Sequence, residues 1–189
     1  MIPVSAPLRF LINVEQFHRM GEAGIIPPDA RVELIEGEVL AMAPIGLRHA
    51  SAVAVLNRML HQPPIGNRTL VWPQNPVVLS QISELQPDVM LLRPRADNYR
   101  DAAPQPDDVL LLIEVSDSTL GFDRQRKVPL YARHGVAEVW IVNIPERCLE
   151  VFRDPTELGY STVFVRRVDE GVAPAAMPDA PIAWGEALG

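Results

Sequence analysis

The chain has 189 residues, of which 48% are hydrophobic and 22% are charged, and its formal net charge is −7 at pH 7. This length and composition suit one globular domain with a sizeable core and argue against a disordered protein. The negative charge argues against a protein that coats DNA regardless of sequence, because such binding depends on many contacts between Lys or Arg and phosphate. It leaves open an enzyme that acts on nucleic acid, since metal-binding carboxylates add to the same negative total.

Cysteine content and hydropathy indicate the compartment in which the protein works. Cys148 is the only cysteine, so the chain can form neither an internal disulfide nor a cysteine-based zinc site, which favours a reducing environment. Residues 1–10 carry one basic residue and no apolar run long enough for a signal peptide. No stretch approaches the roughly 20 apolar residues that cross a bilayer. We therefore expect a cytoplasmic protein that makes no use of a membrane.

The N-terminal part predicts a helix followed by a hairpin. Asn13 can cap a helix that runs to about residue 20. Two short segments, 31–35 and 38–43, alternate apolar and polar residues on either side of Glu36-Gly37. Gly37 can adopt a positive φ, so this spacing is typical of a tight hairpin.

The middle of the chain predicts a second helix and four strands. Between His49 and about His61, apolar residues recur at intervals of three and four, which predicts a helix that Pro63-Pro64 ends. The last two of the expected strands are nearly continuous apolar runs, typical of strands that are covered on both faces. The four strands are expected at residues 68–72, 76–79, 88–92 and 109–115.

The C-terminal part predicts a third helix and three more strands. The helix lies within residues 122–134 and ends at Gly135. Pro129 fits this helix if regular structure starts near Val128, with the proline in the first turn, or if the helix kinks at the proline. The strands are expected at residues 138–143, 149–153 and 160–165.

The order of these elements predicts the fold class. Helices alternate with strands and with a hairpin, which favours an α/β or α+β protein with a mixed sheet and flanking helices. We expect a single domain over residues 1–189, with its core at about 10–167. Residues 168–189 are rich in Ala and Pro, and we expect them to form a loosely packed tail.

Two acidic residues adjoin the strongest apolar strands. Asp88 opens one of these strands directly after Pro87, and Glu114 follows five consecutive aliphatic residues in the other. A carboxylate near a core loses hydration at a cost of several kcal/mol, unless a cation or hydrogen bonds compensate. A divalent cation such as Mg²⁺ or Mn²⁺ would meet this need for both acids. The alternative is that each acid lies at a strand end, where it pairs with an arginine or is solvated.

Lys127 is the third candidate. It lies on the helix that follows the strand of Glu114, and helical spacing places it on one face with Leu130, Tyr131 and His134. On an inward face, a lysine could touch a bound phosphate or orient an attacking water. The alternative is a lysine whose stem packs on the core while its ammonium group remains in water.

Two further residues are ambiguous on sequence alone. Glu33 alternates with Val32 and Leu34, so it is either a third acidic ligand or a surface residue. His49 begins an apolar helical stripe and is either a ligand or a hydrogen-bonded residue at the edge of the core. Motifs of other enzyme classes, namely GxSxG, GxxxxGK[ST], GxGxxG and HExxH, are absent from the sequence.

Several short segments occur in the order seen in the Uma-two putative restriction-endonuclease family, which belongs to the PD-(D/E)XK nuclease superfamily. The resemblance spans about residues 10–167, and the ordered combination is more specific than any single piece. The segments are Val32–Glu38, Met42–Pro44 with His49, Gln86–Val89, Ile113–Ser116 with Ser118-Thr119, Asp123 with Lys127, and Leu130-Tyr131 through Gly135-Val136 to Val139–Val142.

The resemblance implies a restriction-endonuclease-like core and a metal site made of acidic residues and one lysine. In such nucleases the aspartate of the PD pair and the following glutamate hold Mg²⁺, which corresponds here to Asp88 and Glu114. The lysine usually stands two residues after the glutamate, where this chain has Ser116. Lys127, on the next helix, is the matching cation, and Glu33 matches an acid often contributed by the N-terminal part. His49, Ser116 and Asp123 are possible accessory residues.

The function that the resemblance implies is Mg²⁺- or Mn²⁺-dependent hydrolysis of DNA phosphodiester bonds. Because cutting both strands with one site per chain is simplest with two chains, a homodimer is consistent with that function. Two alternatives remain open at this point. One is a catalytically silent nuclease-fold module that binds nucleic acid or a protein partner, and the other is a structural dimerisation domain whose acids are paired with arginines.

Overall fold

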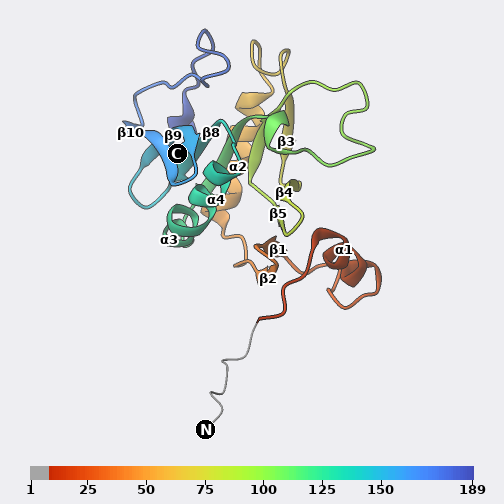
Figure 1. The fold of residues 1–189 in the computed structure, drawn as a ribbon. Coiled ribbons are helices and arrows are strands. Elements are labelled where there is room, and N and C mark those ends of the chain that lie inside the picture. Colours follow the sequence, from red (N-terminus) through yellow and green to blue (C-terminus); the bar gives the residue numbers. More distant parts are fainter. Residues whose placement is uncertain (1–8) are drawn as a thin grey trace.

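The computed structural model describes residues 9–189 and has a mixed α+β architecture with two sheets (Figure 1). The prediction that the first ten residues are not a signal peptide falls mainly outside this range. In the larger sheet β7 and β8 are parallel and the other neighbours are antiparallel, so the predicted mixed sheet is confirmed. Its strands, in spatial order, are β10 (Gly159–Arg167), β9 (Cys148–Thr156), β8 (Glu138–Asn143), β7 (Val109–Ser116), β6 (Val89–Leu92) and β3 (Leu70–Pro73).

The smaller sheet is a second unit that the sequence patterns did not predict. It is antiparallel, in the order β2 (Glu38–Ala41), β1 (Val32–Ile35), β5 (Ser83–Leu85) and β4 (Val77–Ser80). The hairpin β1–β2 was expected, but β5 was missed because three residues are too few to show a period. The pairing of β1 with β5, through Leu34 and Glu84, joins segments about fifty residues apart and leaves no local signal.

Local hydrogen bonds and backbone conformation explain the start of the first helix and the turn of the first hairpin. The larger ones are α1 (Val14–Glu22) and α2 (Leu47–Leu60). Asn13 caps α1 as predicted: its Oδ1 accepts from the Gln16 N–H at 2.8 Å, and the Gln16 Oε1 accepts from the Asn13 N–H at 2.9 Å. In the β1–β2 turn Glu36 and Gly37 have φ values of 51° and 83°, which is the left-handed conformation expected of this hairpin.

The segment after β7 is a broken helix rather than one continuous helix. A short turn, α3 (Leu120–Phe122), leads into a π-helical turn, η2 (Asp123–Lys127), and then into α4 (Val128–Arg133). Pro129 lies in the first turn of α4, which is the first of the two predicted arrangements. Because proline has no N–H to donate to the carbonyl group four residues earlier, the regular ladder is interrupted here, and the chain accommodates this with the wider turn.

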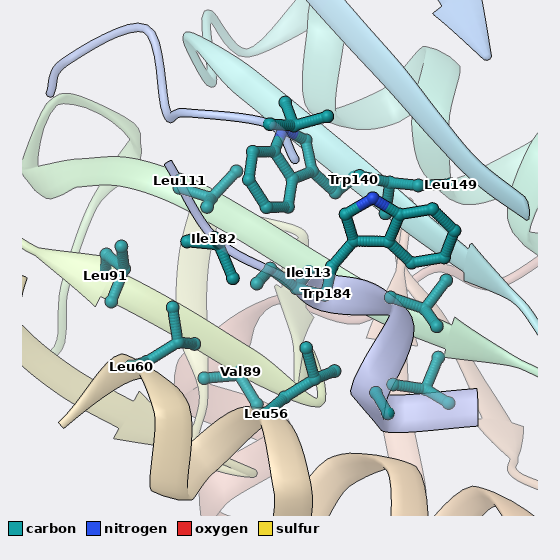
Figure 2. Packing of buried hydrophobic residues seen from close by; sticks show 14 of the residues in the cluster. Leu56, Leu60, Val89, Leu91, Leu111, Ile113, Trp140, Leu149, Ile182 and Trp184 are labelled. Atoms are coloured by element: carbon teal, nitrogen blue, oxygen red, sulfur yellow. The ribbon is translucent and has the colours of Figure 1, made fainter. Parts of the chain in front are cut away.

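Two hydrophobic clusters cover the two faces of the larger sheet. On one face α2 packs against β3, β6 and β7, with Leu56 and Leu60 beside Val89 and Leu91 (Figure 2). On the other face lie α4 and the smaller sheet, with Tyr131 and Ile35 among the buried residues. Every residue of β6 and β8 is buried, in agreement with strands that are covered on both sides.

Residues 168–189 pack into the first cluster, which corrects the prediction of a loosely packed tail. Trp184, in the 3₁₀ turn η3 (Trp184–Leu188), is fully buried near Trp140 and Ile182 (Figure 2). Its indole Nε1 donates to the Glu170 carbonyl at 2.7 Å. Gly185 approaches the Val168 carbonyl so closely that a Cβ would lie 2.1 Å from that oxygen. The composition was misleading because a few large apolar residues of this segment, Val172, Met177, Ile182 and Trp184, are buried and hold it in the core.

Replacing Trp184 with Ala should therefore destabilise the whole fold. We expect the free energy of unfolding to fall by about 3–5 kcal/mol, the range typical of removing a buried aromatic side chain. Urea denaturation followed by circular dichroism measures the change. Leu158→Ala is the control, since Leu158 is 98% exposed. Equal stability of the Trp184→Ala variant and the wild type would mean that the C-terminal segment is not part of the core.

Among residues 9–189, the structure has no helix that is both long enough and apolar enough to cross a bilayer.

Candidate functional site

A cleft opens where β6 and β7 meet the smaller sheet. Its walls come from segments far apart in the chain: β1, the loop before α2, the start of α2, the residues before β6, the end of β7, and the turn η2. The acidic and basic side chains that line it are Arg31, Glu33, His49, Asp88, Glu114, Asp117, Asp123 and Lys127. The structure thus brings all the catalytic and metal-binding candidates, Glu33, Asp88, Glu114 and Lys127, to one place.

Asp88 lies at the entrance to β6, beside the end of β7. Val89 pairs with Ile113, so Asp88 precedes the ladder by one residue and lies level with Glu114. Its Oδ2 accepts the backbone N–H of Val115 at 2.9 Å and contacts His49 Nε2 at 3.0 Å. Asp88 is therefore neither paired with an arginine nor left to solvent, the two alternatives that its sequence position allowed.

Glu114 faces α4 and the smaller sheet. Ile113 and Val115 belong to the cluster on the α2 side, and alternation along the strand turns Glu114 to the opposite face. Its Oε1 accepts from the Tyr131 hydroxyl at 2.6 Å and from Lys127 Nζ at 3.2 Å. The Glu114 carboxylate is thus buried and held by two side chains from the segment after β7.

Glu33 reaches the same place from β1 and is 2% exposed. Its Oε1 accepts the backbone N–H of Gln86 at 3.0 Å and the Lys127 ammonium at 3.0 Å. It is therefore a buried residue of the cleft and not a surface residue. Alternation in the sequence could not show that Glu33 is buried, because β1 is buried on both of its faces.

The three carboxylates share one arrangement. In each, one oxygen accepts two donors: Oδ2 of Asp88, Oε1 of Glu114 and Oε1 of Glu33. Among residues 9–189, no donor reaches the second oxygen of any of the three, and in Glu33 that oxygen, Oε2, is also fully buried. Each carboxylate is thus anchored through one oxygen, and its second oxygen has no donor from the described residues.

Lys127 is buried, with its side chain 7% exposed, and its ammonium group lies between Glu33 and Glu114. The alternative in which its ammonium stays in water is therefore wrong. Burial by itself lowers the pKa of Lys127, but the charges of Glu114 and Glu33 outweigh burial and raise it above the ordinary value. Lys127 consequently remains positively charged in the site.

The pKa of Glu114 is raised as well, which for a carboxyl group favours the uncharged form. Its pKa is raised from 4.5 to about 8: burial is the largest cause, Lys127 opposes the rise, and the nearby Asp123, Asp88 and Glu33 add to it. One ammonium group does not balance this many carboxylates at close range. The site therefore favours either a proton on Glu114 or an additional cation.

The accessory candidates occupy different places. His49, near the start of α2, contacts Asp88, and its Nδ1 has no partner in the described part of the chain. Ser116 and Thr119 both donate to Oδ2 of Asp123 at 2.7 Å. Asp123 thereby ties the end of β7 to the π-helical turn that carries Lys127. Ser116 donates its hydroxyl to Asp123 and does not contact the three anchored carboxylates.

The donor chemistry of the site fits a hard divalent cation. Asp88 and Glu114 line one cleft, and each has a carboxylate oxygen without a donor from the described residues. Carboxylate oxygens suit Mg²⁺ and Mn²⁺. Within the described range, no three His, Cys, Asp or Glu side chains are already grouped as metal ligands. Mg²⁺ does not require such a group, because it commonly binds one or two carboxylates and completes its shell with water and substrate phosphate.

Three contributors to the site were not singled out from the sequence. These are Tyr131 and the backbone N–H groups of Gln86 and Val115. Tyr131 stands four residues after Lys127 on the predicted inward face, so helical spacing carried a signal for it. The backbone donors leave no signature in side-chain patterns, because only strand pairing decides where an N–H points.

Comparison with known proteins agrees with this architecture. Residues 14–184 match the Uma2 family, described as "Putative restriction endonuclease". A crystal structure of a putative nuclease belonging to DUF820 from Anabaena variabilis superposes with a TM-score of 0.70. The two sequences are 15% identical, and the match covers 94% of this chain and 97% of the other. No curated protein matches the sequence.

The fold and the cleft define a mixed α+β protein with a buried site of carboxylates and one lysine. Because the family model matches most of the chain, the protein belongs to the Uma2 family of putative restriction endonucleases. The match continues to residue 184, beyond the expected limit near 167. That extension agrees with the packing of the C-terminal segment into the core.

The raised pKa of Glu114 predicts a pH-dependent stability. Between its ordinary value of 4.5 and about 8, the folded state holds a proton that the unfolded chain has lost, so stability falls as the pH rises through this window. The pKa of Lys127 lies above this window in both states and adds no slope. Without divalent ions, Glu114→Gln should therefore gain stability relative to the wild type between pH 5 and pH 8.

Chemical denaturation at several pH values measures this difference. We expect it to grow by about 1 kcal/mol or more, since one pKa unit corresponds to roughly 1.4 kcal/mol. Glu157→Gln, at an exposed position, is the control and should show a difference that does not change with pH. A constant difference for Glu114→Gln as well would contradict the raised pKa.

Proposed function

We propose that the protein is a metal-dependent endonuclease that hydrolyses DNA phosphodiester bonds on a PD-(D/E)XK core. The observation that carries the proposal is the arrangement of the cleft: three carboxylates are each anchored through one oxygen, and the ammonium group of Lys127 contacts two of them, Glu33 and Glu114. Family membership supports it, since the family description names restriction endonucleases, which act on DNA.

The proposed ligands of Mg²⁺ or Mn²⁺ are the free oxygens of Asp88 and Glu114, with Glu33 as a third acid. When bound, such a cation polarises a phosphoryl oxygen and lowers the pKa of a bound water. The buried carboxylates favour it because it compensates the negative charge that raises the pKa of Glu114. Their anchored oxygens limit rotation, so the free oxygens keep their direction as the cation enters.

Lys127 is proposed to stabilise the negative charge that develops on the phosphate. It is fully charged at neutral pH and is held within hydrogen-bond distance of Glu114. In the PD-(D/E)XK pattern this cation comes from the strand of the glutamate, at the position of Ser116 here. The turn η2 delivers it instead from the following segment, and Asp123 holds that turn against Ser116.

The net reaction of this proposal adds water across one phosphodiester bond. A water oxygen bonds to phosphorus, the bond from phosphorus to the leaving sugar oxygen breaks, and that oxygen takes up a proton.

Arg31 lines the same cleft and donates to the Ala43 carbonyl at 2.7 Å, so a second positive charge lies at the cleft wall. A homodimer remains part of the proposal, because two sites are needed to cut both strands together.

Supercoiled plasmid incubated with the protein and Mg²⁺ or Mn²⁺ tests the activity. The wild type should produce nicked DNA, and linear DNA if two chains act together, whereas Glu114→Gln should lower the rate at least about 100-fold because it removes a charged ligand. Glu157→Gln serves as the matched control and should leave the rate unchanged. Equal cleavage by the wild type and Glu114→Gln would overturn the assignment.

Calorimetry distinguishes the remaining outcomes. Binding of Mn²⁺ together with DNA retention, but without cleavage, would indicate a silent nuclease-fold module. The absence of any Mn²⁺ binding would indicate a structural domain and would overturn the metal site itself.

Lys127→Met separates metal binding from catalysis. Removing a positive charge from beside the carboxylates favours cation binding, so we expect Mn²⁺ affinity to be retained or increased, while plasmid cleavage falls at least about 100-fold. Arg126→Met, which removes the same charge from a half-exposed position one residue earlier, is the control and should cleave normally. Full cleavage by Lys127→Met would remove the lysine from the mechanism.

A further inference from the structure

Tyr131 is a buried polar residue that has no role in the proposed hydrolysis. It lies on α4 with no exposed surface, and its hydroxyl donates to Glu114 Oε1 at 2.6 Å, which is shorter than the contact from Lys127 to the same oxygen. A tyrosine hydroxyl in a core requires a partner. Here the partner is the very carboxylate that the site depends on.

The contact decides which oxygen of Glu114 is free. With Tyr131 and Lys127 both on Oε1, the carboxylate cannot rotate about its terminal torsion without breaking the hydrogen bond from Tyr131. Asp88 is held in the same manner, with His49 and the Val115 N–H on Oδ2. The two acids are thus oriented by independent sets of groups, of which Tyr131 is the one on Glu114 that carries no charge.

We propose that Tyr131 is a positioning residue, which holds Glu114 through Oε1 and thereby presents Oε2 to the divalent cation. This inference rests on the proposed metal-dependent function and goes beyond it by assigning the orientation of one ligand to a named side chain. Tyr131 touches neither the cation nor the substrate in this role. It acts through Glu114 alone.

Lys127 makes the tyrosine necessary. Its ammonium group already lies 3.2 Å from Glu114 Oε1, and an unrestrained carboxylate would turn to share both oxygens with that charge. Tyr131 prevents this turn because its hydroxyl, fixed by the packing of α4, occupies one lone-pair direction of Oε1. The ammonium group and the cation then engage different oxygens of the same acid and need not compete for one.

Tyr131→Phe tests the proposal, since it removes the hydroxyl and keeps the ring. The Kd for Mn²⁺, measured by titration calorimetry on the full chain, should weaken by about 10-fold or more, as expected when the group that orients a metal ligand is lost. In the plasmid assay, the Mn²⁺ concentration for half-maximal cleavage should rise by a similar factor, while the KM for DNA stays unchanged. A purely structural tyrosine would lower thermal stability without moving the Kd.

Tyr160→Phe is the matched control. Tyr160 also donates its hydroxyl inside the fold, to the Val136 carbonyl at 2.7 Å, but it does not line the cleft. Its loss should leave the Kd for Mn²⁺ unchanged. An unchanged Kd for Tyr131→Phe would overturn the positioning role while leaving the proposed function intact, whereas no Mn²⁺ binding by the wild type would overturn both.

Lys127→Met provides the second variant should Tyr131→Phe fail to fold. In that variant Tyr131 is the only remaining donor to Glu114 Oε1 among the described residues. If the tyrosine orients the carboxylate, Mn²⁺ affinity should be at least as high as in the wild type. A loss of Mn²⁺ affinity in Lys127→Met would show that the tyrosine does not hold Glu114 by itself.

Discussion

Removing charged groups from water is the constraint on which this structure depends. Glu33, Glu114, Asp88 and Lys127 are all at least nine-tenths buried, and each buried ion costs several kcal/mol unless partners replace its hydration. The protein replaces it from three sources: backbone N–H groups at strand ends, one ammonium group, and the side chains of Tyr131 and His49. These donors satisfy only half of the carboxylate oxygens of these three acids, and the other half have no donor from the described residues. The stability requirement and the proposed chemistry therefore concern the same side chains.

The two sheets and the broken helix together bring these buried charged side chains into one site. Alternation on β7 sends Val115 to the α2 side and Glu114 to the α4 side, while the Val115 N–H still reaches Asp88. The smaller sheet delivers Glu33 from the opposite wall. The π-helical turn η2, which accompanies Pro129, aims Lys127 between the two glutamates. A π-helical turn at such a point fits the general association of these turns with functional sites. The Lys127 ammonium group thus reaches Glu114 from the segment that follows β7.

Much of the local structure could be predicted from the sequence, because capping, alternation and turn chemistry act over a few residues. The Asn13 cap, the Glu36-Gly37 turn and the strands containing Met90 and Leu112 were all found where these rules placed them. The predictions failed where the decisive contact was distant. The strand at 83–85 is defined only by its partners, and Trp184 is buried by surfaces that its own neighbours do not reveal.

The sequence by itself determined that Asp88 and Glu114 adjoin buried strands and that Lys127 follows on an inward face, since hydrophobic periodicity is a property of the chain alone. Only the tertiary structure decided that Glu33 joins them, that the Lys127 ammonium group is buried between two acids, and that Tyr131 holds Glu114. The physical reason is that a side chain of either kind, charged or hydroxylated, is compatible with a surface position until its partners are known. Its role depends on which donors and acceptors the fold brings within hydrogen-bond distance, and those partners come from segments up to 94 residues away in the chain.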